Sequence, residues 1–262
     1  MNRLALGIAY RGDSYRGWQS QPDGRTVQDC VESALAKFAG RSLKAHCAGR
    51  TDAGVHGLNQ VIHLDTEIDR ENISWVRGTN RHLPADIAVQ WCRRVPPDFD
   101  ARFSALGRRY VYVLLEAPVR PALESGTVGW TFRPLDAMAM AEASRCLLGE
   151  HDFSAFRSSQ CQARTPVKTL RSLDIARVGA YWRFDFDASA FLHHMVRNLM
   201  GCLVAVGTGA RAPAWLQGVL EARQRALAAP TFAAEGLYFA GPYYDAKHEI
   251  PRHTAAMDWL PR

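Results

Sequence analysis

The stretch that decides the fold is residues 43–65, LKAHCAGRTDAGVHGLNQVIHLD. Residues 43–48 and 58–65 have the composition of β-strands, and three glycines fall within the nine residues 49–57. Glycine adopts backbone conformations that other residues resist, so the pattern predicts two strands joined by a tight loop. Loops that are held by strands on both sides are frequent locations for catalytic groups.

The segments on either side of this stretch complete a recognisable order. Thr26 is expected to open a helix, because apolar residues follow it at i, i+3, i+4 and i+7 spacing and Gly40 can cap its end. The remaining elements of the first half are a strand at 3–10, a weak helix at 70–82 and a strand at 86–95. Strand, helix, strand, strand, helix, strand is the split βαβ pattern of a ferredoxin-like unit.

The second half repeats this pattern without repeating the residues. Its expected strands are 108–116, 170–178, 181–187 and 236–240, and its expected helices are Pro134 to about Leu148, 191–206 and 214–228. We therefore expect an α+β fold of two ferredoxin-like (βαββαβ) subdomains, residues 1–100 and 101–245. They would share an extended antiparallel sheet, with helices on one face and a central basic cleft. Residues 246–262 form a tail with no assigned role.

The composition limits the class of protein. The formal charge is +6, and 28 of the 32 basic residues are arginine, which can grip phosphate oxygens in pairs. A polyanionic partner fits this charge, but a preference for arginine codons would explain it equally well. The six cysteines show no C-x-x-C spacing, so we expect reduced thiols and no zinc ribbon. With neither a signal peptide nor an apolar run of membrane-spanning length, a cytoplasmic location without membrane association is expected.

The glycine-rich loop carries one candidate catalytic group. Asp52 follows Arg50 by two residues, and a neighbouring guanidinium would keep a carboxylate ionised and in one orientation. Such a carboxylate serves as a nucleophile or a base. The alternative is a turn in which Asp52 caps backbone amides.

Six motifs in order resemble the TruA family of tRNA pseudouridine synthases (tRNA pseudouridine synthase A). The loop 49–57, GRTDAGVHG, is similar to the catalytic motif of that family. The other five are YRGWQ at 15–19 with TVQ at 26–28, RFSA at 102–105 with RRY at 108–110, RTP at 164–166, FLHHMVRN at 191–198 and EGL at 235–237. The match extends over roughly residues 3–245.

The resemblance implies an enzyme, a tRNA pseudouridine(38–40) synthase. It would be a homodimer in which one tRNA contacts both subunits, and it would isomerise uridines 38, 39 and 40 in the anticodon arm. Isomerisation exchanges no atoms or electrons with another molecule, so no cofactor is expected. Asp52 would attack C1′ of the ribose or C6 of the base, or act as a base at the sugar, and the sequence does not choose among these.

The resemblance also implies roles for four other residues. Tyr110 would stack on the flipped uracil, although alternation places Tyr112 on the same strand face. Arg50 would hold Asp52 or fill the vacancy left by the flipped base. Arg197 aligns with a basic position near the active site, or is an ordinary helix-surface arginine. Leu237 resembles an apolar residue of the base pocket, or belongs to the core.

Other interpretations remain open. A metal site at His193 and His194 is not expected, because adjacent residues on a helix diverge by about 100° and no further ligand motif is near. A non-catalytic RNA-binding protein would not need Asp52. A hydrolase that releases uracil would need a second, water-activating group. Within the family, the alternative is a pseudouridine synthase with a different RNA site specificity.

Overall fold

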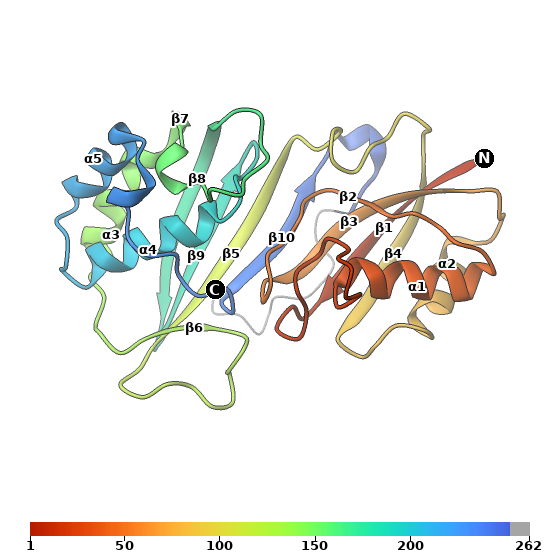
Figure 1. The fold of residues 1–262 in the computed structure, drawn as a ribbon, viewed down its shortest axis with the longest axis horizontal. Helices are drawn as coiled ribbons and strands as arrows, with labels where there is room; N and C mark the ends of the chain where they lie inside the picture. Colours follow the sequence, from red (N-terminus) through yellow and green to blue (C-terminus); the bar gives the residue numbers. More distant parts are fainter. Residues whose placement is uncertain (252–262) are drawn as a thin grey trace. The chain divides into compact units, whose positions relative to one another are not determined.

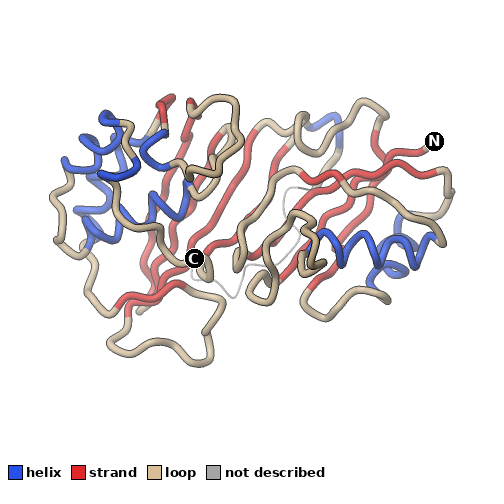
Figure 2. The backbone as a smooth tube through the Cα atoms, viewed as in Figure 1, coloured by secondary structure: helices blue, strands red, loops and turns tan. Residues whose placement is uncertain are grey.

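The computed structural model describes residues 1–251, and these form two compact units (Figures 1 and 2). The first unit contains Met1–Arg108 and the segment that begins at Tyr238, and the second contains Arg109–Leu237. The chain therefore leaves the first unit once and returns to it near the end.

The first unit has the predicted ferredoxin-like order. Its elements are β1 (Asn2–Tyr10), α1 (Val27–Ala39), β2 (His46–Cys47), β3 (His56–Thr66), α2 (Asn72–Asn80), β4 (Ile87–Val95) and β10 (Leu237–Tyr243), the last of which begins at the final residue of the second unit. β1 lies between β4 and β3 and pairs antiparallel with both, and β2 pairs antiparallel with β3. β10 is an addition that runs parallel to β3.

One face of the first unit's sheet carries both helices. The side chains of Leu4, Leu6 and Ile8 alternate along β1 and are buried in one cluster with Val31 of α1 and Trp75 of α2. This is the face that the alternation of β1 and the helical spacing of α1 predict. The predicted caps are also present, because the Thr26 side chain accepts a hydrogen bond from the Asp29 amide and Gly40 has a φ of 71°.

The opposite face of this sheet has a smaller core. Ala5, Val61 and Trp91 lie there, covered by Phe99 and Tyr244. Tyr244 follows β10, so the returning segment completes this side of the first unit.

The second unit contains a similar series of elements. They are β5 (Gly107–Glu116, with its first two residues in the first unit), β6 (Gly129–Thr131), α3 (Ala137–Ser144), β7 (Gly149–Asp152), β8 (Val167–Val178), β9 (Tyr181–Ala188), α4 (Met195–Gly207) and α5 (Ala214–Ala222). The strand order is β5-β9-β8-β7, and β6 lies beside β5. Trp182, Phe184 and Phe186 alternate along β9 and are buried.

The predicted α+β class is confirmed, with several local differences. β2 has only two residues, β6 and β7 were not expected, and two strand pairs, β3 with β10 and β5 with β6, are parallel. The helix expected at 214–228 ends at Ala222, because Arg223 takes a left-handed conformation, and a short 3-10 turn follows at Arg225–Leu227. The tail contains the 3-10 turn Ala246–His248, and residues 252–262 lie outside the described residues.

Candidate active site

In the loop between β2 and β3, hydrogen bonds fix Thr51 and the carbonyl of Asp52. Thr51 is buried, its hydroxyl shares a hydrogen bond of 2.8 Å with the Tyr10 hydroxyl, and its carbonyl accepts one of 3.1 Å from the Trp18 amide. On the other side, the Val55 amide donates to the Asp52 carbonyl at 3.2 Å, across a turn in which Gly54 has a φ of 79°. The backbone at Asp52 is therefore defined, and its side chain is half-buried.

The segment after β1 packs directly against this loop. A Cβ atom on Gly12 would lie 1.9 Å from the Val55 carbonyl oxygen, and one on Gly17 would lie 2.5 Å from the Thr51 carbonyl oxygen. The Gly12 amide also donates to Nδ1 of His56 at 3.0 Å. This close approach explains why the YRGWQ motif accompanies the GRTDAGVHG motif: each fixes the backbone of the other.

The ends of the loop are tied to β3, β10 and the start of β5. The Gln60 amide group donates to the Gly49 carbonyl, and Arg108 donates to the Ala48 carbonyl at 3.1 Å. His56 stacks on Tyr238 of β10, with ring centroids 4.6 Å apart. The loop therefore has support from parts of the chain that are distant in sequence.

Arg50 is exposed on the same loop. Burial raises the pKa of the Cys47 thiol to about 11, and the positive charge of Arg50 opposes that increase. The Arg50 guanidinium is thus close enough to act on charges at the base of the loop. Its expected pairing with the Asp52 carboxylate stays a prediction.

Tyr110 and Tyr112 have different environments in the second unit. Tyr112 is fully buried, and its hydroxyl donates to the Ala233 carbonyl at 3.0 Å. Tyr110 is half-buried, and its ring meets the edge of Phe191 at a centroid distance of 5.0 Å. Tyr112 is therefore a core residue, and of the two rings that alternation could not separate, Tyr110 is the more accessible.

Arg197 and Leu237 lie in the second unit, and each bonds to the backbone of residues 232–234. Nε of Arg197 donates to the Phe232 carbonyl at 2.9 Å, and the Phe232 amide donates back to the Arg197 carbonyl at 3.1 Å. Leu237 is buried, and its amide donates to the Ala234 carbonyl. Arg197 is thus half-buried and bonded to the backbone, and its place near the active site stays a prediction. Leu237 is compatible with either of its two proposed roles.

The sequence reasoning gave no role to Asn198, although it organises this region. Asn198 is fully buried, and its amide nitrogen donates to the Phe156 carbonyl at 2.8 Å. Its Oδ1 accepts hydrogen bonds from the Thr231 hydroxyl at 2.7 Å and from Arg225 at 3.1 Å. The signal in the sequence was a single amide among the apolar residues of α4.

The expected helical placement of His193 and His194 is wrong. α4 begins at Met195 and not at residue 191, because His194 takes a left-handed conformation with a φ of 63°. The two rings lie 4.1 Å apart instead of diverging. The expectation that no metal is bound therefore loses its support from helix geometry and rests on the lack of a further ligand motif in the sequence nearby.

None of the helices among residues 1–251 is long and apolar enough to cross a membrane.

The comparisons with known proteins agree with one another. A family model described as tRNA pseudouridine synthase matches residues 8–104 and 143–245, which include Asp52, Arg197 and Leu237 but not Tyr110. The tRNA pseudouridine synthase A of Methylibium petroleiphilum is 70% identical and covers 99% of this chain and 100% of its own. That of Polaromonas naphthalenivorans is 59% identical with the same coverage.

Among solved structures, one from the crystal structure of a Cbf5-Nop10-Gar1 complex aligns at 14% identity and a TM-score of 0.36, over 77% of this chain and 45% of its own. That likeness is too weak to support an argument. The family model and the full-length relatives are sufficient: the chain belongs to the tRNA pseudouridine synthase family, whose members are isomerases.

Proposed function

We propose that this protein converts uridine to pseudouridine at positions 38, 39 and 40 in the anticodon arm of tRNA, with Asp52 as the catalytic carboxylate. The observation that carries the proposal is the braced position of Asp52. Thr51 before it is fixed by hydrogen bonds, the Asp52 carbonyl accepts one from the Val55 amide, and Asp52 is half-buried, so the backbone that carries the carboxylate is held in one place. Constant placement of the reacting group is what catalysis requires.

The chemistry fits a single carboxylate. The N1 glycosidic bond must break, the uracil must turn, and C5 must bond to C1′. C5 loses a proton and N1 gains one, so every heavy atom of the substrate stays in the product. Asp52 would attack C1′ or C6, or remove a proton from the sugar. Glycoside hydrolysis normally uses two carboxylates. The loop from Gly49 to Gly57 contains one carboxylate, that of Asp52.

The substrate base must leave its helical stack before it can react. Tyr110 would support the extruded uracil, because its ring is more accessible than that of Tyr112. Arg50, exposed on the loop, would orient Asp52 or occupy the vacated position in the RNA. Arg197 and Leu237 would line the base pocket, and the protein would act as a cytoplasmic homodimer.

The decisive experiment maps pseudouridine in unmodified tRNA transcripts after incubation with the purified protein. We expect pseudouridine at positions 38–40. Asp52→Asn should lower the rate by at least about a thousandfold, the scale of losing a catalytic nucleophile, while the Kd for tRNA stays within a few-fold of wild type. Asp69→Asn is the matched control, because Asp69 undergoes the same chemical change at a side chain that is 76% exposed.

Each other outcome has a definite meaning. Comparable turnover by Asp52→Asn would contradict the catalytic role of this carboxylate. Pseudouridine at other positions would contradict the proposed specificity. It would support the alternative, a pseudouridine synthase that acts at a different RNA site. Release of free uracil would identify a hydrolase.

A further inference from the structure

The loop that joins β4 to β5 presents an aromatic ring to solvent. Phe103 is 79% exposed, and the neighbouring Arg102 is also exposed, with its guanidinium carbon 5.3 Å from the centroid of the Phe103 ring. Single exposed apolar residues are common on protein surfaces. What distinguishes Phe103 is the set of hydrogen bonds that holds the backbone of its loop.

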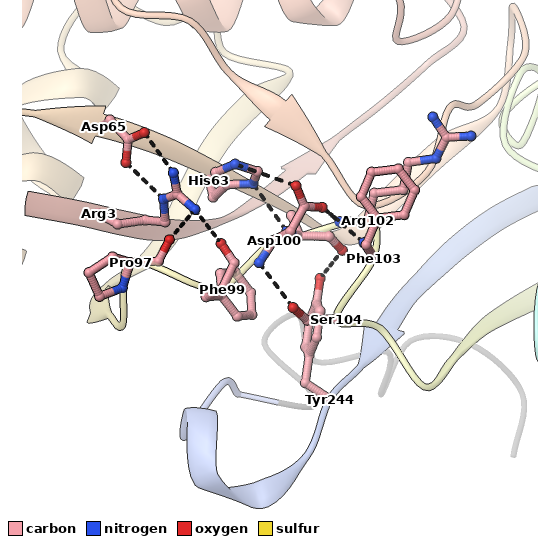
Figure 3. Close-up of polar contacts among 11 residues, drawn as sticks. Arg3, His63, Asp65, Pro97, Phe99, Asp100, Arg102, Phe103, Ser104 and Tyr244 are labelled. Carbon is pink, nitrogen blue, oxygen red and sulfur yellow. Dashed lines mark hydrogen bonds and ion pairs between the residues drawn. The ribbon is translucent and has the colours of Figure 1, made fainter.

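Asp100 fixes the backbone of this loop. Its Oδ1 accepts hydrogen bonds from the amides of Arg102 and Phe103 at 2.8 and 2.9 Å (Figure 3). Its own amide donates to the Ser104 hydroxyl at 3.0 Å, and the Ser104 amide donates to the Asp100 carbonyl at 2.9 Å. Although burial alone would raise the pKa of Asp100, these amides lower it, so the carboxylate stays ionised and the loop stays braced.

Further hydrogen bonds connect this loop to the sheet of the first unit. The Ala101 amide donates to Nδ1 of the buried His63 at 3.0 Å, and the Tyr244 hydroxyl donates to the Ala101 carbonyl at 2.7 Å. Arg3 donates to the Phe99 carbonyl at 3.0 Å. Residues of β1, β3 and the segment after β10 thus fix the residues just before Phe103 (Figure 3). The ring projects from a rigid support.

The surroundings of the ring are cationic. The Arg102 guanidinium lies beside the ring, and the positive charges of Arg50 and Arg102 both oppose the effect of burial on the pKa of the Cys47 thiol. Arg108 donates to the Arg102 carbonyl at 2.5 Å and to the Ala48 carbonyl at 3.1 Å. One guanidinium therefore ties the Phe103 loop to the segment that leads into Arg50 and Asp52.

We propose that this loop is an RNA-binding element, in which the Phe103 ring stacks on an unpaired base of the substrate and Arg102 contacts an adjacent phosphate. The inference rests on the proposed function, which makes RNA the substrate. Single-stranded RNA is recognised by stacking on aromatic side chains and by arginine. The cationic surroundings favour RNA over a second copy of this chain, whose formal charge is +6.

The second unit supplies a matched control. Phe132 is 60% exposed, and the Arg133 guanidinium carbon lies 5.5 Å from its ring centroid, so the local pair is chemically the same. It follows β6 in the second unit, where the Arg133 amide donates to the Thr131 hydroxyl at 3.2 Å. Phe132 therefore has the same kind of arginine beside it but belongs to a different unit from Asp52.

The test compares Phe103→Ala, Phe103→Tyr and Phe132→Ala in the full chain, with an unmodified tRNA transcript as the probe. Phe103→Ala should raise both the Kd for tRNA and the KM at least about fivefold, the lower end of what base stacking contributes, with kcat within twofold of wild type. Phe103→Tyr should retain wild-type values, and so should Phe132→Ala. In Arg102→Gln, the plot of log affinity against log salt should be less steep, by about the amount that one phosphate contact contributes.

A Kd for Phe103→Ala within twofold of wild type would overturn the inference, as would an equal loss in Phe132→Ala. If Phe103→Ala lowers the oligomeric mass in sedimentation while tRNA affinity is unchanged, the ring is a contact between copies and the inference fails. Because Phe103 is mostly exposed, thermal unfolding should not change, and this checks that the variant is folded. Wild-type protein that binds tRNA through Phe103 but forms no pseudouridine would contradict the proposed function alone.

Discussion

The Asp52 loop of the first unit and the Arg197 region of the second differ in one means by which they are fixed. In the first, side-chain bonds are joined by direct contact of backbone with backbone, because Gly12 and Gly17 approach the loop so closely that no side chain fits. In the second, side chains make the connections, because Asn198 bonds to three other groups and Tyr112 bonds to Ala233. The comparison teaches that a site can be positioned by the absence of side chains or by their hydrogen bonds. Variants that disturb these two kinds of contact should therefore differ in their effects on stability and activity.

The largest effect should come from Gly12→Ala, which breaks the backbone contact. The new Cβ would lie 1.9 Å from the Val55 carbonyl oxygen, so the Asp52 loop must move. We expect a loss of about 2 to 3 kcal/mol in unfolding free energy and about a hundredfold in kcat/KM, since small misplacements of a catalytic group are costly. Denaturant unfolding and initial rates measure both. Gly218→Ala is the control, because nothing lies within 4 Å of its added Cβ. Near-wild-type activity in Gly12→Ala would show that the loop tolerates displacement.

The next effect should come from Asn198→Ala, which breaks the side-chain contact. The variant leaves the Phe156 carbonyl, the Thr231 hydroxyl and Arg225 without their buried partner. We expect a loss of about 2 kcal/mol in unfolding free energy, because each buried group left unsatisfied is costly. A double-mutant cycle with Thr231→Val should reveal coupling. Strict additivity of the two changes would argue against one network.

The smallest effect should come from Tyr112→Phe, which removes one bond of the second region. Losing the bond to the Ala233 carbonyl should cost about 1 kcal/mol in unfolding free energy and leave kcat nearly unchanged. Tyr110→Leu is the contrasting variant, which should lower kcat/KM with little change in stability, because Tyr110 is half-buried. Denaturant melts and initial rates of both variants give the comparison. If Tyr112→Phe loses activity while Tyr110→Leu does not, the roles of the two rings are reversed.

Much of the fold was predictable from local patterns. The apolar spacing of α1 and its caps at Thr26 and Gly40 are present as expected, because they depend on residues close together in the sequence. The start of α4 was not predictable, since His194 takes a left-handed conformation that residues other than glycine adopt only rarely. β6 and β7 are also too short for a periodic pattern to reveal them.

The candidate site was predictable to the extent that glycines marked it. Glycines mark the loop from Gly49 to Gly57 in the sequence, because Gly54 has a φ of 79° and a Cβ atom on Gly57 would lie 2.3 Å from the Tyr10 ring. Asn198 was not found, because its importance lies in contacts with Phe156, Arg225 and Thr231, which are far from it in sequence. The exposure of Phe103 was equally invisible, since an aromatic residue near a strand is more often buried.

The return of the chain to the first unit has a consequence during synthesis. Asp52 leaves the ribosome before Tyr238, which stacks on His56, and before Tyr244, which holds Ala101. A nascent chain that has reached the end of the first half therefore lacks the strand that pairs with His56 and Gly57, and it lacks the part of the cover over Ala5 and Val61 that Tyr244 provides. The candidate loop should therefore acquire its full set of contacts only after residues 238–244 have been synthesised.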